Sequence, residues 1–150
     1  MTEAATQLSE TLFALLQKET FCLLGTTDAE TGGPAANAIS WIYAVNPATL
    51  RFAVDQRSRI ISNVNTNSTV NVTLFGGGTV NVVYGHAKVI KNELEEVPFK
   101  LSCMDIEISF VRDAMFYGAR ISTEPEYEKT YDKRAAAKLD NQVFSAMRKA

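Results

Sequence analysis

Hydrophobic and polar residues alternate with a period of two over most of the middle of the chain. Such alternation is typical of strands that bury one face, and it recurs at 20–26, 35–45, 50–55, 69–75, 79–91 and 105–111. Clusters of glycine, proline and asparagine lie between several of these segments, at 28–34, 46–49 and 76–78, and such clusters are typical of turns. The pattern predicts antiparallel strands, with 35–45 and 50–55 forming a hairpin.

Helical periodicity appears near both ends of the chain and once between strands. Leu8, Leu12, Leu15 and Leu16 predict an amphipathic helix within 1–18, and 58–65 predicts a short helix between two strands. Thr123 and Glu126 form a capping-box pattern with a proline between them, which predicts a helix over 123–150. The apolar stripe of that helix is Tyr127, Tyr131, Ala135, Leu139, Val143 and Met147.

Together these elements predict an α+β fold with six strands in a small antiparallel barrel and with helices at its periphery. At 150 residues the length favours a single domain. The predicted organisation is a helix over 1–18, the barrel over 20–122 and the helix over 123–150. Gly85 lies within a long strand, which predicts a bulge or a sharp bend there.

Composition narrows the functional classes. The chain is 46% hydrophobic and 21% charged, with a net charge of −2, so it is of the soluble globular type. A weakly acidic protein is not expected to bind nucleic acid through charge alone. No apolar run is long enough to cross a membrane, and the N-terminal residues lack the cationic start of a secretory signal. The predicted location is the cytoplasm.

Few residues suggest catalysis or metal binding. Cys22 and Cys103 lie in apolar segments without a partner at metal-ligand spacing, so buried free thiols are favoured over a disulfide. His86 is the only histidine and favours a surface or interface role, and no metal site is expected. Asp105 and Glu107 lie two apart on one strand, where solvated carboxylates are favoured over general acid–base work. No catalytic residue can be assigned.

The most informative stretch is 50–75, which predicts strand, short helix, Asn-rich turn and strand. Ser58 and Arg59 open the helix, and a helix start with these side chains suits an anion, because backbone N–H groups and the positive end of the helix dipole point there. Arg51, Arg57 and Arg59 form a local basic run that favours a binding site over a polymer footprint. An ordinary helix cap with a solvated arginine is the alternative.

The order of these segments resembles the FMN-binding split barrel of the pyridoxamine 5′-phosphate oxidase-like superfamily. The resemblance covers roughly 12–111 and rests on Gly25-Thr26, Gly33-Pro34 and the segments AISWIYA, RFAVDQRSRIISNVNTN, VNVTLF and VNVVYGHAKVI. Its most specific part is the spacing from Ser58-Arg59 to Asn67, followed by a strand that ends in an aromatic residue. The resemblance implies a six-stranded antiparallel split barrel that binds FMN at the interface of a homodimer.

The resemblance also implies roles for individual residues. Ser58 and Arg59 would hold the flavin phosphate, since arginine offers a planar fork of donors to phosphate oxygens. Ile39, Ser40 and Trp41 would line the isoalloxazine edge, largely through backbone groups. Val54 and Asp55 would close the same pocket from the neighbouring strand. Asn81 lies next to the position from which a family amide contacts the ring.

The sequence departs from the family's oxidases where they place further cations, since Ala38, Tyr43 and Ile60 stand there. The implied function is therefore an FMN-dependent oxidoreductase acting on an unknown small molecule rather than full pyridoxamine phosphate oxidase activity. Two alternatives stay open. One is a flavin- or haem-binding protein without turnover, such as a stress protein. The other is a cofactor-free dimeric module on the same fold. Trp41 favours the core or the dimer interface over cofactor stacking.

Overall fold

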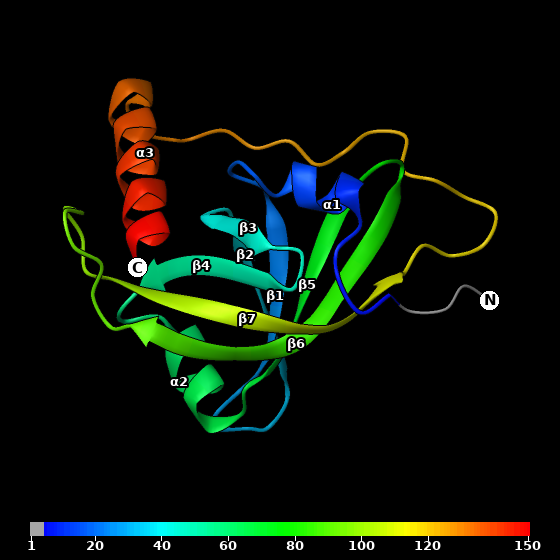
Figure 1. The fold of residues 1–150 in the computed structure, drawn as a ribbon, viewed down its shortest axis with the longest axis horizontal. Coiled ribbons are helices and arrows are strands. Elements are labelled where there is room, and N and C mark those ends of the chain that lie inside the picture. Colours follow the sequence, from blue (N-terminus) through cyan, green and yellow to red (C-terminus); the bar gives the residue numbers. More distant parts are fainter. Residues whose placement is uncertain (1–4) are drawn as a thin grey trace.

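Figure 1 shows the fold in a computed structural model, which describes residues 5–150. A strongly curved antiparallel sheet forms the body, a short helix lies near each end of the barrel, and a longer C-terminal helix stands at its side. The elements are α1 (Glu10–Leu15), β1 (Cys22–Thr27), β2 (Pro34–Ile39), β3 (Ile42–Asn46), β4 (Thr49–Asp55), α2 (Arg59–Thr66), β5 (Thr69–Gly76), β6 (Thr79–Lys91), β7 (Leu101–Asp113) and α3 (Lys133–Lys149).

The sheet closes on itself through one bent strand. Its order is β2-β1-β5-β6-β7-β4-β3, so β2 and β3 occupy the two ends, although only Ser40 and Trp41 separate them in sequence. The single strand predicted over 35–45 is therefore two strands, and the count rises from six to seven. β3 pairs with β4, as the predicted hairpin requires, whereas β2 turns away and pairs with β1. This bend turns an open sheet into a split barrel.

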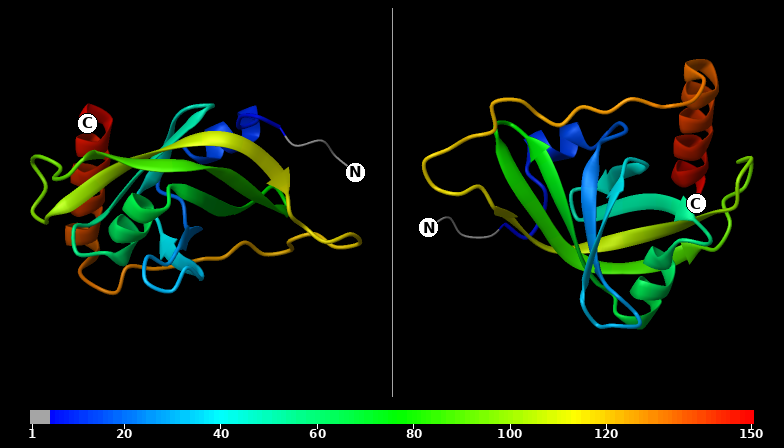
Figure 2. Two further views of the ribbon diagram at one scale, coloured as in Figure 1. Left: turned by 90° about the horizontal axis from the view of Figure 1, so that it is seen from below. Right: turned by 180° about the vertical axis from the view of Figure 1, so that it is seen from behind.

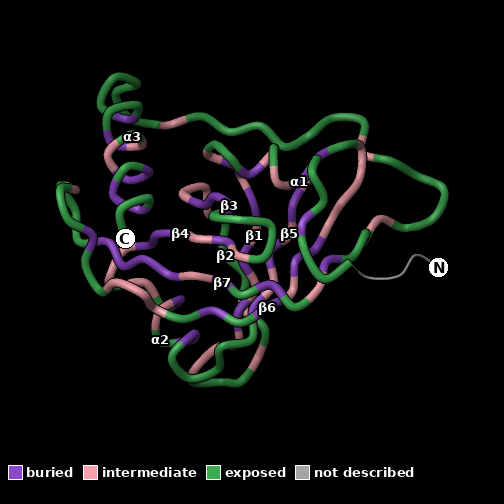
Figure 3. Tube along the Cα trace, viewed as in Figure 1, coloured by how far each residue is buried: buried purple, intermediate pink, exposed green. Residues whose placement is uncertain are grey.

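The inward-facing side chains form the core that the alternation predicted. Leu24, Phe52, Val72 and Ile106 are fully buried, and the buried positions follow the strands in Figure 3. Strand β7 begins at Leu101, earlier than predicted, because apolar residues there face a second cluster outside the barrel. Cys22 and Cys103 are free and buried, as predicted, and burial raises the pKa of each thiol to about 12.

The two long strands β6 and β7 bend at Gly85. Their register shifts between Tyr84 and Gly85, which confirms the predicted bulge. A Cβ atom at this position would collide with the backbone oxygen of Glu107 on β7, so only glycine allows the strands to approach this closely. Gly77 and Gly78 form the β5–β6 turn with φ angles of 65° and 78°, which side chains disfavour. This bend at Gly85 lets β6 and β7 follow the curvature of the barrel.

Helix α1 lies at one end of the barrel and is shorter than predicted. It spans Glu10–Leu15, with the hydroxyl of Ser9 accepting a hydrogen bond from the amide of Leu12. Leu8, Leu12 and Leu16 are buried in the main core. The predicted range began at residue 1, and residues 1–4 lie outside the described part of the chain.

The capping-box pattern at 123–126 does not start a helix. The segment 114–132, here called the strap, has no regular secondary structure and runs along the barrel end that carries α1 (Figures 1 and 2). The amide of Ile121 donates to the oxygen of Gly78, and the ring of Tyr127 lies 5.6 Å from that of Phe21. These contacts hold the strap extended, which a helix from residue 123 would not allow.

Helix α3 begins at Lys133 because Asp132 caps it, its carboxylate accepting from the amide of Ala135. Leu139, Val143 and Met147 are buried against Tyr43 and Cys103 in a second core, which confirms this half of the predicted stripe. The other half is wrong, since Tyr127 and Tyr131 are about half exposed outside any helix and Ala136 replaces Ala135 as the buried alanine. Over residues 5–150, no helix is long and apolar enough to cross a membrane.

Candidate functional site

The split between β2 and β4 gathers most of the predicted site residues. The amide of Ala53 donates to the oxygen of Trp41, but beyond this point β2 turns away from β4. One edge of β2 therefore pairs with no strand of the described chain. Ile39, Ser40 and Trp41 stand where the two strands part. Asp55 and the start of α2 follow at the end of β4, so the split runs from Trp41 towards Arg59.

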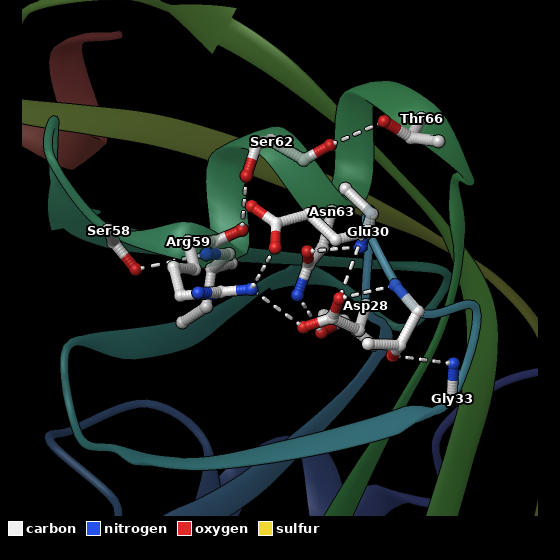
Figure 4. A network of polar contacts seen from close by, with 12 residues as sticks. Asp28, Glu30, Gly33, Ser58, Arg59, Ser62, Asn63 and Thr66 are labelled. Atoms are coloured by element: carbon white, nitrogen blue, oxygen red, sulfur yellow. Dashed lines mark hydrogen bonds and ion pairs between the residues drawn. The ribbon is translucent and has the colours of Figure 1, made fainter.

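Figure 4 shows the start of α2, where Ser58 caps the helix. Its hydroxyl accepts from the amide of Ile60 at 3.1 Å, and its backbone oxygen accepts from the amide of Ile61. One turn further on, Asn63 is only 2% exposed and accepts from the amide of Ala29 while donating to the hydroxyl of Thr26. Asn63 thus fixes α2 against the turn between β1 and β2.

Arg59 faces the same β1–β2 turn and contacts two carboxylates there. Its Nη2 atom lies 3.0 Å from Oδ2 of Asp28 and 3.8 Å from Oε2 of Glu30. The other oxygen of Asp28 accepts from the amides of Glu30 and Thr31, both at 2.9 Å. These backbone hydrogen bonds, with help from Arg59, lower the pKa of Asp28, so its carboxylate is charged at neutral pH.

The other two arginines of the predicted basic run are also paired. Arg57 folds back onto Asp55, with Nε 3.1 Å from Oδ1, and its hydrogen bonds lower the pKa of that carboxyl. Arg51 instead contacts the end of α3 and β7, where its Nε and Nη2 atoms donate to the two carboxylate oxygens of Asp105. Arg51 is therefore not part of the site, and Asp105 is not the solvated carboxylate that the sequence suggested.

Ser40 and Trp41 belong to a network that the sequence did not predict. The hydroxyl of Ser40 donates to Glu19 at 2.7 Å, and the indole nitrogen of Trp41 donates to Asp140 on α3 at 2.9 Å. Lys129 from the strap joins the two carboxylates, at 2.8 Å and 3.2 Å. Contacts across about a hundred residues, such as Trp41 with Asp140, leave no local pattern in the sequence.

Asn81 lies away from the other predicted residues. It lies on β6 opposite Leu74 of β5, which is opposite Cys22 of β1, which in turn is opposite Ile39 of β2. Asn81 is therefore three strands away from Ile39. It lines a cavity of about 230 Å³ beside α1 that also includes Leu12 and Glu124. A single chain therefore does not bring Asn81 to the split.

A larger hollow of about 560 Å³ lies on the outer face of β1, β2 and β5. Gly25 and Ala36 form part of its lining, and Asn71 and Tyr84 line it as well. A side chain at position 25 would collide with the amide oxygen of Asn71, so glycine makes room for that amide. Tyr84 stacks on Phe110 with ring centres 4.6 Å apart. The hollow borders β2, whose Pro34 and Ala35 also line it.

The sequence matches the family model described as pyridoxamine 5′-phosphate oxidase over residues 8–105. The chain belongs to this family. The match spans the barrel from the start of α1 into β7, so it includes the whole split. No curated protein matched the sequence.

Several solved structures share the fold at low sequence identity. A proposed pyridoxamine 5′-phosphate oxidase of Lactobacillus delbrueckii aligns with a TM-score of 0.63 and 17% identity, over 74% of this chain and 99% of that one. General Stress Protein 26 of Bacillus anthracis aligns at 0.57 and 15%, over 69% and 91%. An FMN-binding protein of Syntrophomonas wolfei aligns at 0.53 and 13%, over 71% and 83%.

The two ends of the split differ in how well they fit a flavin nucleotide. Along β2, an edge without a strand partner offers backbone donors and acceptors of the kind that a flavin's pyrimidine ring requires. At the start of α2, Arg57 and Arg59 are both bound to carboxylates. The predicted ring end therefore fits, whereas the predicted phosphate end does not fit a doubly charged anion.

Proposed function

We propose that the protein is a homodimeric flavin-binding barrel that serves an oxidation–reduction reaction of a small molecule. The observation that carries the proposal is the unpaired edge of β2 along the split, in a chain that belongs to the pyridoxamine 5′-phosphate oxidase family. A bound flavin would supply the two-electron chemistry itself, and the protein would supply binding, orientation and exclusion of water. The absence of an assignable catalytic residue is compatible with this division of labour.

Ile39, Ser40 and Trp41 would hold the ring edge in this proposal. Ser40 and Trp41 are fixed on their other sides, since Glu19 and Asp140 accept from their side chains. Lys129 ties both carboxylates together, so the strap and α3 stiffen the point where the strands part. A rigid support of this kind keeps backbone donors and acceptors oriented before a ligand arrives.

A second copy of the chain is the expected partner. Leu23, Ala36, Ala38, Val80 and Tyr84 are exposed or half-buried on the outer face of neighbouring strands. Burying such a face stabilises association in proportion to the apolar area removed from water. The buried free thiols suit a reducing compartment such as the cytoplasm.

The direct test is the visible absorption spectrum of freshly purified protein, followed by titration with FMN and riboflavin while flavin fluorescence is recorded. We expect a flavin spectrum or saturable quenching at micromolar protein, and bleaching of the bound flavin by NADPH or NADH. A colourless protein that quenches neither flavin contradicts the proposal. Bound flavin that neither nucleotide reduces supports a binding protein without turnover.

A cofactor-free dimeric module is the second candidate, and one observation favours it. Both arginines at the start of α2 are paired with carboxylates of the same chain. A protein that sediments as a dimer and binds neither flavin would fit this candidate. Dimerisation alone fits both, so flavin binding decides between them.

A further inference from the structure

The start of α2 carries more negative than positive charge. Arg57 and Arg59 are its cations, and Asp28, Asp55 and Glu30 are the carboxylates that contact them. The group therefore has one net negative charge when all five side chains are ionised. A phosphate dianion approaching Arg59 would meet two carboxylates bound to the same guanidinium.

The backbone donors at this helix start are also engaged. The amide of Arg57 donates to Oδ1 of Asp55, and the amide of Ser58 donates to the Asp55 carbonyl. The amides of Ile60 and Ile61 donate to the hydroxyl and carbonyl of Ser58. Four of the five amides from Arg57 to Ile61 thus have acceptors within the chain, whereas an anion site at a helix start requires free N–H groups.

Asp28 is held in place by the turn and does not depend on Arg59 for its position. Its side chain is 18% exposed, and two backbone amides fix one of its oxygens. Moving the carboxylate away from Arg59 would break the turn that α2 packs against through Asn63. Glu30 differs, since its side chain is 81% exposed and its Oε2 atom lies 3.8 Å from the guanidinium of Arg59.

We propose that the α2 end of the split accepts an uncharged or cationic ligand tail, so that the protein takes a flavin without a terminal phosphate at least as well as FMN. The inference rests on the proposed function, because it names the ligand class of the same site. In this arrangement, Arg59 is bound to the β1–β2 turn through Asp28, and the Asp28 carboxylate neutralises the guanidinium of Arg59 towards the split.

The test compares riboflavin with FMN, which share the ring and differ in the phosphate. Each charge-assisted hydrogen bond to the phosphate would favour FMN by about tenfold or more. For the unchanged protein we expect dissociation constants of FMN and riboflavin within about threefold of each other. FMN binding about tenfold or more tightly than riboflavin overturns the inference while leaving flavin binding intact. Failure of both flavins to bind overturns the proposed function instead.

Charge-removing variants sharpen the test. Asp28→Asn retains an oxygen for the two turn amides, and Glu30→Gln changes an exposed side chain. The double variant should bind FMN about fivefold or more tightly, with riboflavin binding unchanged, because two repulsive charges are gone. The matched control is Glu10→Gln/Glu126→Gln, which removes two exposed charges from α1 and the strap. An equal gain in the control, or no gain in the double variant, overturns the inference.

Inorganic phosphate tests the charge at the start of α2 without a flavin. We expect phosphate to raise the Tm of the unchanged protein and of Arg59→Gln equally, since Arg59 does not bind it. The Asp28→Asn/Glu30→Gln variant should gain an additional increase that the control variant lacks. A larger phosphate effect in the unchanged protein than in Arg59→Gln would show that Arg59 binds phosphate as it stands, which overturns the inference. If the variant with Asp28→Asn does not fold, the same Tm measurement with phosphate is made on Glu30→Gln alone, which should show the same kind of additional increase.

Discussion

The Arg51–Asp105 pair and the Arg59–Asp28 pair contain the same chemical groups but have different structural roles. Arg51 and Asp105 form two short hydrogen bonds, 2.7 Å and 3.0 Å, with side chains 13% and 17% exposed. Arg51 also donates to the carbonyl oxygens of Met147 and Ala150 at the end of α3. Arg59 makes one hydrogen bond to Asp28 and is 66% exposed. The first pair anchors a helix, and the second sets the charge of a surface split.

The largest expected effect comes from breaking the Arg51–Asp105 pair. Asp105→Ala leaves a largely buried guanidinium without its carboxylate, so the free energy of unfolding should fall by about 3 kcal/mol. Urea denaturation measures the loss. Glu107→Ala, two residues along the same strand and exposed, should change stability by less than about 0.5 kcal/mol. Equal losses in the two variants would contradict a structural role for the pair.

The substitution Trp41→Phe should lower the free energy of unfolding by less than Asp105→Ala and by more than Arg59→Ala. The substitution keeps an aromatic ring but removes the hydrogen bond to the charged Asp140. Unfolding free energy should fall by about 1.5 kcal/mol, near the lower end for hydrogen bonds to charged groups. Phe99→Leu, at an aromatic residue that is 55% exposed, serves as the control for thermal denaturation. A variant as stable as the original protein would show that α3 is held without this contact.

Arg59→Ala should have a small effect on stability. Exposed ion pairs contribute less than about 1 kcal/mol, and Asn63 continues to hold α2 on the turn. Arg57→Ala, whose side chain is 91% exposed, provides the comparison, and both variants should unfold near the same urea concentration. A loss as large as that of Asp105→Ala would make the two pairs equivalent and remove the distinction drawn above.

The pH dependence of Asp28 should give the smallest effect. Backbone hydrogen bonds and Arg59 lower its pKa in the folded protein, so the folded state binds a proton less readily than the unfolded state. The resulting stability is present above the ordinary pKa of about 3.9 and is lost as the pH falls through the lower folded value. The Tm difference between the original protein and Asp28→Asn should therefore shrink in acid. A difference that grows below about pH 4 would contradict this assignment.

Local patterns in the sequence predicted most of the strands because alternation survives any bend of the sheet. The break at Ser40-Trp41 was missed for the same reason, since residues on both sides continue the pattern of an uninterrupted strand. At 123–126 the capping-box pattern was present, but contacts of Tyr127 and Lys129 with the barrel hold the strap extended. Tertiary contacts here override a local helix signal.

The candidate site was predicted in its residue types more than in its electrostatics. Ser58 caps α2, and Ile39 to Trp41 lie where β2 and β4 part; their role in holding a flavin stays a prediction. The ion pair between Arg59 and Asp28 joins residues 31 apart, through a turn whose position only the fold determines. The three arginines of the basic run are therefore each paired with different carboxylates. The net charge around a site cannot be counted until the fold shows which charged residues lie beside it.

A crystal structure of the protein grown with riboflavin tests the central claim most directly. The account predicts a dimer with the ring along the unpaired edge of β2, between Trp41 and Arg59, and with the Arg59–Asp28 pair intact. A β2 edge that is paired with a strand of the second copy, with no ring at the split, would contradict it.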